Sequence, residues 1–403
     1  MPSDLSAKNR GARKYHSATP SSIRAVNRAI LLNLIRLQAP ISRAGLSERT
    51  GIFRSNVSEI VDELIESGLV REKRAVPVGR GRVPFHLYLN DAGFRVLGIS
   101  IRPDKTHAAY AGLGGEIQNS LSFATPKTPR GLMNELRLAI REMRSWIPDA
   151  SGHLFEQICV SIPGLADAAR GRVLWVPALP EYSDFALGEE LEKLAGAPVS
   201  VDNDNNLAAL AEMWLEDKSE MRLDNFVFLE IGDVGVGAGL ILNHEIYRGH
   251  DSTFAAEFGH MVVDPSGPRC ECGRRGCWEL FVSNRATWAR CTNLEFDAAR
   301  FEELIQSGLS GDRRVAKAFR ETADRLSLGI SNIVLALNPE VVVVMGRITK
   351  LWHIIRPVVE GVRMRSGIKV CVRPARLQTE NAFLQGAVSY AVSKAFAQPN
   401  LGW

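Results

Sequence analysis

Residues 257–279 read EFGHMVVDPSGPRCECGRRGCWE, and this stretch contains three of the six cysteines in a chain of 403 residues. Thiols that cluster so closely beside a histidine are typical of a metal site. Three thiolates and one imidazole complete a tetrahedron around zinc, which is the closed arrangement of a structural site. Gly273 and Gly276 allow the loop to fold back on the metal. We therefore predict one structural zinc per chain, held by His260, Cys270, Cys272 and Cys277.

The alternative for these cysteines is a set of buried thiols that only pack. The composition is that of an ordinary globular protein, with 45% hydrophobic and 23% charged residues, and it excludes wholesale disorder or a small disulfide scaffold. No apolar run approaches the roughly 18 residues of a membrane span, and the polar N-terminal stretch does not resemble a secretory signal. We therefore expect a cytoplasmic protein without a membrane partner. The isolated cysteines are expected in the core, and they are Cys159, Cys291 and Cys371.

Strands alternate with helices from Asp91 onward, which is typical of an α/β fold. The expected strands cover residues 95–101, 106–111, 157–161, 226–231, 238–242 and 340–345. The clearest expected helices cover residues 132–145, 206–215 and 324–337.

Residues 21–90 predict a separate module that begins with two helices. A serine at position 21 or 22 can cap the first helix, and Pro40 ends it. The second helix runs from a Ser42 cap to about Thr50, where Gly51 makes a tight turn. We expect the first helix to carry on its apolar face Val26, Ile30, Leu34 and Leu37.

A third helix is predicted over residues 53–67, where FRSNVSEIVDELIES spaces its apolar residues for one buried face. Gly68 suits the left-handed turn that ends this helix. Two strands, over residues 69–74 and 83–89, then flank the segment VPVGRGR. Three helices followed by a two-stranded wing predict a winged helix-turn-helix.

Charge also separates this module from the rest of the chain. Residues 1–82 hold 15 Lys and Arg against 7 Asp and Glu, whereas the remainder hold 34 against 38. A basic module on a mildly acidic body indicates a polyanionic partner, and we expect a double-stranded DNA operator. The third helix would enter the major groove, and the wing would contact phosphates or a minor groove. The expected DNA contacts are Arg54, Ser55, Asn56, Ser58, Arg80 and Arg82. A protein-docking module with a solvated polar face is the alternative.

Three further motifs accompany the metal loop, namely EFGH at 257–260, DNDNN at 202–206 and GVGAG at 235–239. Together with the cysteine cluster they resemble the ROK family, which groups sugar kinases with sugar-responsive transcriptional regulators. The resemblance covers the chain from about Asp91 to the end, and the basic winged module is what the regulator branch adds in front. It implies an α/β fold of the two-lobed, actin-like sugar-kinase type.

The resemblance also implies the domain organisation. A flexible basic arm is expected at 1–20, and the winged helix-turn-helix at 21–90. The first lobe would span 91–200 and be completed by a C-terminal helix at 384–398, and the second lobe with the zinc would span 201–383.

In the family a sugar lies between the lobes, with the zinc-bound histidine between metal and ligand. The positions that match the family's sugar contacts are Asn203, Asp204, Glu257, His260 and Glu279. Asp204 is also placed to cap the helix that follows it. Two departures indicate a sugar other than plain glucose: Ala178 stands where the family often has Asn, and Asp202 stands where Glu is common.

The phosphate loops that the family's kinases share are altered here. The first loop reads GISIRPDKT, in which an Asp, two Gly and a Thr are replaced by Ser100, Arg102, Pro103 and Asp104. In the second loop Val234 replaces a Thr and Asp233 adds a negative charge, so the remaining glycines predict a tight strand–turn–strand. Backbone cannot approach a phosphate closely without glycine, and a carboxylate there repels it. We therefore predict no catalytic residues and no kinase activity.

The sequence predicts a sugar-responsive transcriptional regulator, a repressor, that binds its operator as a homodimer or homotetramer. Two alternatives stay open. One is an active sugar kinase with a regulatory DNA-binding head. The other is a repressor controlled by a protein partner, such as a phosphotransferase component, instead of free sugar.

Overall fold

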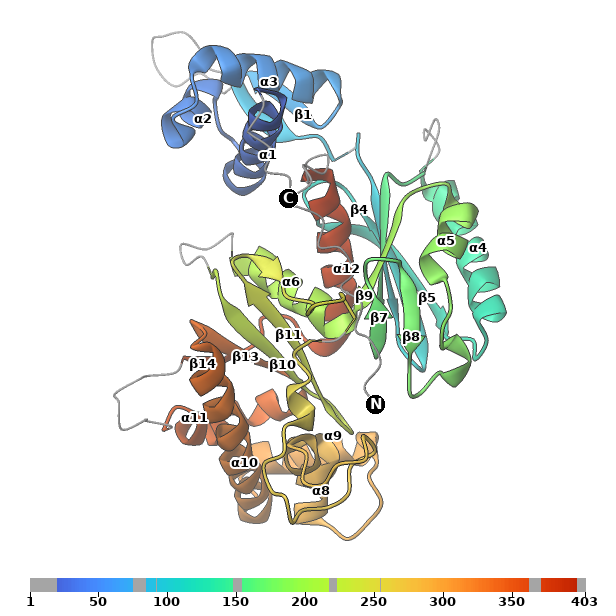
Figure 1. Ribbon diagram of the computed structural model, residues 1–403, viewed down its shortest axis with the longest axis vertical. Helices are drawn as coiled ribbons and strands as arrows, with labels where there is room; N and C mark the ends of the chain where they lie inside the picture. Colours follow the sequence, from blue (N-terminus) through green and yellow to red (C-terminus); the bar gives the residue numbers. More distant parts are fainter. Residues whose placement is uncertain are drawn as a thin grey trace, which may run out of the picture. The chain divides into compact units, whose positions relative to one another are not determined.

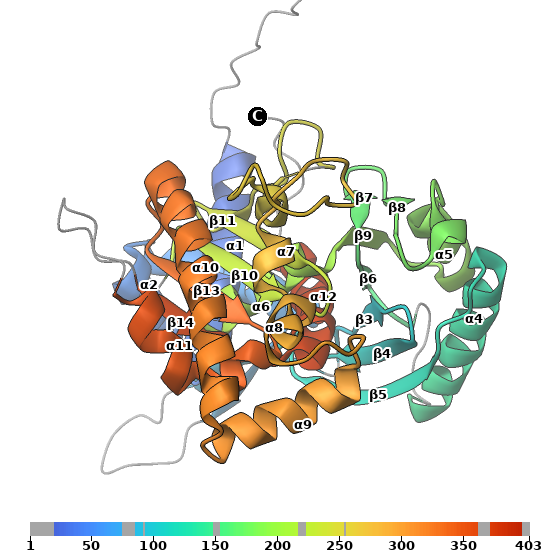
Figure 2. The same cartoon turned by 90° about the horizontal axis from the view of Figure 1, so that it is seen from below.

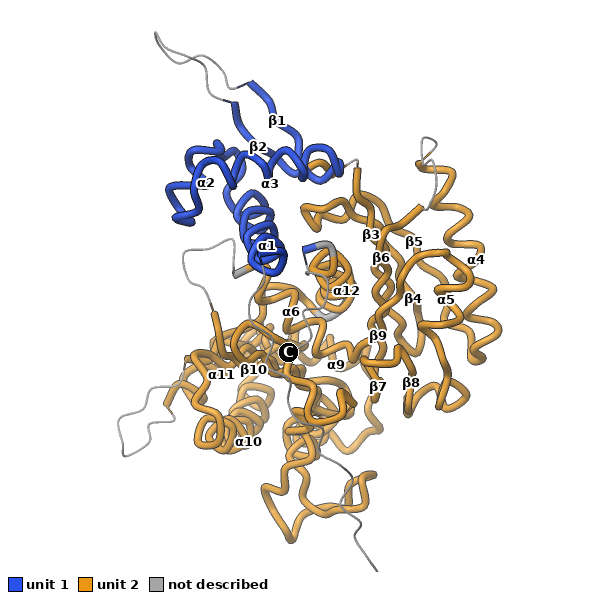
Figure 3. Tube along the Cα trace, turned by 45° about the horizontal axis from the view of Figure 1, so that its top comes forward, with its two compact units in different colours: residues 1–89, 396–403 blue, residues 90–395 orange. Residues whose placement is uncertain are grey.

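The computed structural model describes residues 20–74, 85–91, 93–147, 154–216, 223–253, 255–361 and 371–396. The chain divides into two compact units (Figure 3). The head unit comprises residues 1–89 and 396–403, and the body unit comprises residues 90–395. None of the described helices has both the length and the apolar composition that crossing a membrane requires.

The described part of the head unit consists of helices followed by a two-stranded sheet. The elements are α1 (Pro20–Gln38), α2 (Arg43–Thr50), α3 (Arg54–Glu66), β1 (Val70–Arg74) and β2 (Phe85–Leu89). The strands pair antiparallel, with Val70 opposite Leu89. Ser42 caps α2 by accepting a hydrogen bond from the N–H of Gly45, and Gly51 ends it with a φ of 72°. This is the element order of a winged helix-turn-helix.

The buried face of α1 differs from the predicted one. Val26 and Ile30 were expected inside but are 40% and 45% exposed. The helix instead buries Leu31, Leu32 and Ile35. Both sets of residues have helical spacing, so the periodicity alone is compatible with two faces. The packing of α2, α3 and β2 against α1 selects between them.

The first sheet of the body unit has the strand order β5-β4-β3-β6-β9. Its strands are β3 (Val96–Ile101), β4 (Lys105–Ala111), β5 (Ile117–Ala124), β6 (Gln157–Ile162) and β9 (Val199–Asn203). β3, β4 and β5 form an antiparallel meander, and β6 and β9 extend the sheet in parallel. The outer face is covered by α4 (Pro129–Trp146) and α5 (Leu187–Ala195) (Figure 2). A hairpin of β7 (Leu165–Asp167) and β8 (Arg172–Trp175) follows β6.

The second sheet repeats this order, as β12-β11-β10-β13-β14. Its strands are β10 (Phe226–Ile231), β11 (Val236–Leu242), β12 (Glu245–Ile246), β13 (Val341–Met345) and β14 (Val372–Pro374). One face packs on α7 (Glu279–Val282), α8 (Asn284–Cys291), α9 (Ala298–Leu309), α10 (Arg313–Leu337) and α11 (Trp352–Val359). Short 3-10 helices are η1 (Pro180–Tyr182), η2 (Phe258–His260) and η3 (Arg347–Leu351). In both sheets the first strand lies at the centre.

Helices α6 (Asp204–Glu216) and α12 (Thr379–Phe396) lie between the two sheets (Figure 1). Both contribute side chains to the core on the inner face of the second sheet. Gly98 of β3 lets α12 approach the first sheet, because a Cβ there would lie 2.6 Å from Cγ2 of Val388. Gly386 does the same towards α6, where a Cβ would lie 2.2 Å from the backbone oxygen of Leu207. The chain's last helix therefore joins the two halves of the body.

The strands and helices predicted for the body are present, with shifted ends. The largest shift is in α10, which begins at Arg313 and not at residue 324. Cys159 and Cys291 are buried as predicted, but the prediction for Cys371 is wrong, because its side chain is exposed. Cys371 immediately precedes β14, which is the edge strand of the second sheet.

Candidate functional site

Four side chains of the metal loop converge on one point. Their donor atoms all lie within 4.8 Å of one another, and the residues are His260, Cys270, Cys272 and Cys277. The Sγ atoms of Cys272 and Cys277 are 3.5 Å apart, and Sγ of Cys270 lies 3.6 Å from Nδ1 of His260. Thiolates bound at ~2.3 Å in a zinc tetrahedron are separated by roughly 3.8 Å. The cluster is therefore able to hold a metal ion.

The backbone of the loop brings these ligands together. Gly276 has a φ of 68°, and a Cβ there would lie 1.6 Å from the backbone oxygen of Asp264. This position accepts only glycine. Trp278 is fully buried and packs on Gly329 of α10, where a Cβ would lie 2.0 Å from the indole ring. The loop is thereby anchored to the helices of the second sheet.

Two of the predicted sugar contacts, His260 and Glu279, lie at this cluster. Oε1 of Glu279 accepts a hydrogen bond from the Cys270 thiol at 3.0 Å and lies 3.3 Å from Nδ1 of His260. Burial raises the pKa of the Cys277 thiol, whereas the backbone N–H of Arg274 lowers the pKa of Cys272 to about 7. Cysteines bind metal as thiolates, so Cys272 is the ligand that is most readily deprotonated at neutral pH.

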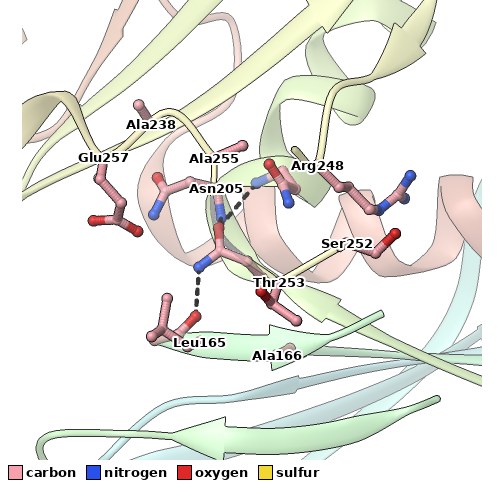
Figure 4. A pocket seen from close by; sticks show the side chains of 13 residues that line it. Leu165, Ala166, Asn205, Ala238, Arg248, Ser252, Thr253, Ala255 and Glu257 are labelled. Atoms are coloured by element: carbon pink, nitrogen blue, oxygen red, sulfur yellow. Dashed lines mark hydrogen bonds between the residues drawn. The ribbon is translucent and has the colours of Figure 1, made fainter. Parts of the chain in front are cut away.

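A hollow opens at the carboxyl ends of β6 and β9 (Figure 4). Open α/β sheets bind their ligands at this edge. Backbone of Gly164–Ala166 and of Gly237–Ala238 forms part of the wall. The polar side chains on the wall are Asn203, Asn205, Asn206, Arg248, Ser252, Thr253 and Glu257. Two predicted sugar contacts, Asn203 and Glu257, therefore line the hollow.

Asn203 ends β9 and caps α6. Its Oδ1 accepts hydrogen bonds from the N–H groups of Asn205 at 2.9 Å and Asn206 at 3.2 Å, and its Nδ2 donates to the backbone oxygen of Gly164 at 2.9 Å. The helix-capping role considered for Asp204 is thus shared with Asn203. Burial raises the pKa of Glu257. Among the other predicted contacts, the charges of Glu279 and Asp204 also raise this pKa, whereas His260 lowers it.

Asp204 is 3% exposed and lies behind the wall of the hollow. Its Oδ2 accepts from Nη1 of Arg102 at 2.8 Å, while its Oδ1 accepts from the backbone N and the Nδ2 of Asn205, both at 2.9 Å. Arg102 follows β3 directly. Its guanidinium also lies over the ring of Phe383, 4.6 Å from the centroid. The stretch that was compared with the kinase phosphate loop therefore supplies an ion pair with Asp204.

Gly232 and Gly235 lie in the turn between β10 and β11, whereas Gly237 and Gly239 lie in β11, so the predicted strand–turn–strand is present. The N–H of Gly232 donates to the oxygen of Gly235 at 3.0 Å. In this turn Asp233 accepts a hydrogen bond from Nδ2 of Asn284 at 2.8 Å. A Cβ at Gly237 would lie 2.2 Å from Nδ2 of Asn205, so this glycine serves side-chain packing.

In the head unit, the N-terminal half of α3 presents polar side chains to solvent. Arg54, Ser55 and Asn56 are exposed and Ser58 is partly exposed. The opposite face is anchored by buried Val57, Ile60, Val61 and Leu64. Phe53, which the prediction passed over, directly precedes the helix and is 79% exposed. Arg80 and Arg82 lie outside the described residues.

Other wall residues were also missed. Arg248 lines the hollow, and its Nε donates to Oδ2 of Asp202 at 2.8 Å. Ser252 and Ala256 flank the wall segment before Glu257, with φ values of 62° and 57° that are uncommon for residues with a Cβ. No motif surrounds Arg248 or Ser252, so the sequence held no signal that would separate them from surface residues.

Comparison with known proteins gives one family and several full-length relatives. The profile of the ROK family matches residues 96–393. The xylose repressor of Bacillus subtilis (strain 168) is 29% identical over 335 residues, which cover 82% of this chain and 84% of the repressor. A ROK family transcriptional regulator, described as a homologue of the E. coli MLC protein, has a crystal structure with a TM-score of 0.78 at 25% identity. This likeness covers 93% of this chain and 96% of the regulator.

A ROK family glucokinase from Streptomyces griseus, solved with glucose and AMPPNP, has a TM-score of 0.62 at 25% identity. It covers 74% of this chain but 99% of the kinase. The kinase thus corresponds to part of the chain, whereas the regulator corresponds to nearly all of it.

Proposed function

Because this chain belongs to the ROK family, we propose that it is a DNA-binding transcriptional repressor that a sugar releases from its operator. The head unit carries this proposal. The head has the element order of a winged helix-turn-helix. The ROK glucokinase, in contrast, corresponds to 74% of this chain although 99% of the kinase is covered. A regulator matches 93% of the chain. Phosphoryl transfer has no use for such a module, whereas a regulator needs one to reach DNA.

We infer that α3 enters the major groove of a double-stranded operator. Arg54, Ser55, Asn56 and Ser58 would contact base edges, which arginine, serine and asparagine side chains recognise by hydrogen bonds. Arg80 and Arg82 would contact phosphates or a minor groove. The balance of 15 Lys and Arg against 7 Asp and Glu in residues 1–82 supports this assignment. A homodimer or homotetramer would present two heads to two half-sites.

We infer that the cluster of His260 and three cysteines holds one structural zinc and that the sugar binds in the neighbouring hollow. Zinc prefers this ligand set, and the sulfur separations support it. A histidine held through Nδ1 keeps its other nitrogen for a hydroxyl. The proposed sugar contacts are Asn203 and Glu257, which line the hollow, together with Asp204, His260 and Glu279, which are not among its lining residues.

Sugar-dependent operator binding is the experiment that tests this function. The operator is obtained by selecting tight-binding duplexes from a random library, and the probes are D-xylose and D-glucose, which the names of the relatives suggest. We expect at least one sugar to release the DNA. Tight operator binding that a full panel of monosaccharides leaves unchanged would contradict the proposal and favour control by a protein partner.

Glu257→Ala is expected to leave operator binding intact and to weaken the response to sugar. Glu257 lines the hollow, so its loss removes a contact made with the sugar and not with DNA. A hydrogen bond to a charged group contributes about 1.5–3 kcal/mol, which corresponds to a roughly 10- to 100-fold higher sugar concentration for half release. The measurement is a DNA-binding titration against sugar, with a metal assay on the same sample.

Glu271→Ala is the matched control, because Glu271 is exposed in the metal loop and its carboxylate is not among the proposed contacts. A Glu257→Ala protein that keeps its metal and still releases DNA at the wild-type sugar concentration would show that Glu257 does not bind sugar.

We predict that the protein does not transfer phosphate from ATP to D-glucose or D-xylose, with or without Mg²⁺. The Arg102 guanidinium is paired with Asp204, and Asp233 places a carboxylate in the second turn, where it would repel a phosphate. The measurement is the formation of radiolabelled sugar phosphate. Transfer that Asp204→Asn abolishes would contradict the prediction and support the kinase with a regulatory head.

A further inference from the structure

Arg102 places a positive charge beside a buried carboxylate under the sugar pocket. Its Nη1 lies 2.8 Å from Oδ2 of Asp204, whose side chain is 4% exposed, while the Arg102 side chain is 31% exposed. The ring of Phe383 supports the guanidinium from below at 4.6 Å. These contacts hold the cation in one place, because a stacked guanidinium loses much of its freedom to rotate.

The surroundings of Asp204 are otherwise acidic. Glu230 of β10 is 9% exposed, and its carboxyl interacts with Asp204, with the side chain of Asn205 and with Asp233. Glu257 lies in the segment before η2, and the charge of Asp204 raises its pKa. Burial raises the pKa of Glu230 to about 7 and also raises the pKa of Asp204, whereas Arg102 opposes both shifts. Arg102 is thus the cation paired with Asp204 in this group of carboxyls, and Arg347 lies 3.9 Å from Asp233.

Asp204 is linked to the wall of the hollow through Asn205. Oδ1 of Asp204 accepts from both the backbone N and the Nδ2 of Asn205, and Asn205 lines the hollow. Gly237 leaves the room in which the Asn205 amide lies. Hydrogen bonds to an ionised carboxylate are stronger than those to a protonated carboxyl, which keeps only part of its acceptor capacity. The charge state of Asp204 therefore affects the wall residue that faces the ligand.

We propose that Arg102 is a positioning residue of the sensor, which keeps Asp204 ionised and thereby holds Asp204 and Asn205 in the arrangement that binds sugar. The proposal rests on the sugar-sensing function proposed above. It explains why an arginine stands in the altered phosphate loop and why a buried aspartate persists at a site without phosphate loops. Arg102 acts through Asp204 and not by contact with the reacting or bound molecule.

The charge balance gives the direction of the pH effect. Without Arg102 the folded protein holds a proton on Asp204 at pH values where the unfolded chain has released it. Stability of such a variant rises as the pH falls towards the ordinary pKa of aspartate. The stability lost by Arg102→Gln should therefore be largest near pH 8 and shrink on acidification. One extra bound proton changes the folding equilibrium by about tenfold per pH unit.

The first experiment is urea unfolding of the full chain between pH 5.5 and pH 8. The ratio of the folding constants of wild type and Arg102→Gln is expected to fall by up to about tenfold per pH unit of acidification. In an Asp204→Asn background, Arg102→Gln is expected to lose this pH dependence. Arg102→Lys should restore most of the wild-type profile, because it returns the charge. Arg137→Gln, which removes an exposed arginine of α4, should change nothing.

Parallel pH profiles for wild type and Arg102→Gln would overturn the proposal. A pH dependence that persists with Asp204→Asn but disappears with Glu230→Gln would assign the proton to Glu230 and overturn it as well.

The second experiment measures calorimetric binding of D-xylose and D-glucose at the same pH values. We expect the affinity of Arg102→Gln to fall about tenfold further than that of the wild type between pH 8 and pH 6, because only the variant takes up a proton on Asp204, whereas Glu230 titrates in both proteins. If Arg102→Gln lost the same affinity at every pH, Arg102 would have a structural role only, and its positioning role would be overturned. Failure of the wild type to bind any sugar would instead overturn the sensing function, and the unfolding series would still decide the charge of Asp204.

Discussion

Cys277→Ser is expected to remove the metal and to unfold the segment around it. Cys277 is fully buried between the loop and Trp278, and its thiol lies 3.5 Å from that of Cys272. A serine hydroxyl is a much poorer zinc ligand than a thiolate. Structural zinc contributes apparent free energies of about 10–16 kcal/mol in small modules, which is comparable with the ~5–15 kcal/mol net stability of a whole protein. Losing one ligand should therefore cost most of the metal and several kcal/mol.

Zinc content measured by mass spectrometry should fall from about one per chain to near zero, together with a lower melting temperature. Cys291→Ser is the matched control, because Cys291 is also buried but lies apart from the cluster. Its zinc content should equal that of the wild type. A Cys277→Ser protein with full zinc loading would remove this residue from the ligand set.

Arg54→Ala is expected to weaken operator binding by about 5- to 150-fold at fixed salt. Arg54 is the first residue of α3, the helix proposed to enter a major groove, and its side chain is exposed. A bidentate contact between arginine and guanine contributes roughly 1–3 kcal/mol of discrimination. The variant should also lose its preference for one base pair of the selected operator, whereas loss of a phosphate contact would weaken all sequences alike.

Fluorescence anisotropy with the selected operator and with single-base variants measures both effects. Every titration is made at the same ionic strength, because binding that neutralises several phosphates falls steeply with salt. Arg170→Ala is the control. Arg170 belongs to the body unit and is 79% exposed, and its substitution removes the same charge. An unchanged base preference together with unchanged affinity would show that Arg54 does not contact the operator.

The metal loop and the main strands could be predicted because their signals are local. Three cysteines lie within eight residues, and the turn glycines at 273 and 276 stand between them. Buried strands such as Val341–Met345 show as apolar runs. β5 lacked such a signal, because most of its side chains are exposed and half of them are polar.

The parts that could not be predicted depend on contacts between distant residues. Arg102 and Asp204 are 102 positions apart, and no pattern in either motif indicates that they pair. The sequence indicated that Arg102 is incompatible with a phosphate loop, but not that its guanidinium forms an ion pair with Asp204. The face of α1 was wrong for a related reason, since two apolar stripes were available and tertiary packing selected one.

The position of α12 has a consequence for synthesis. The described core of the head unit is built from residues 31–89 and can form once these residues leave the ribosome, before residues 396–403 of the same unit are made. The body cannot be completed until translation reaches Val388, because this residue packs on Gly98 of the first sheet. A nascent chain therefore has α3, the helix proposed to read DNA, before it has a finished body. During that interval the head is not subject to the sugar that later controls it.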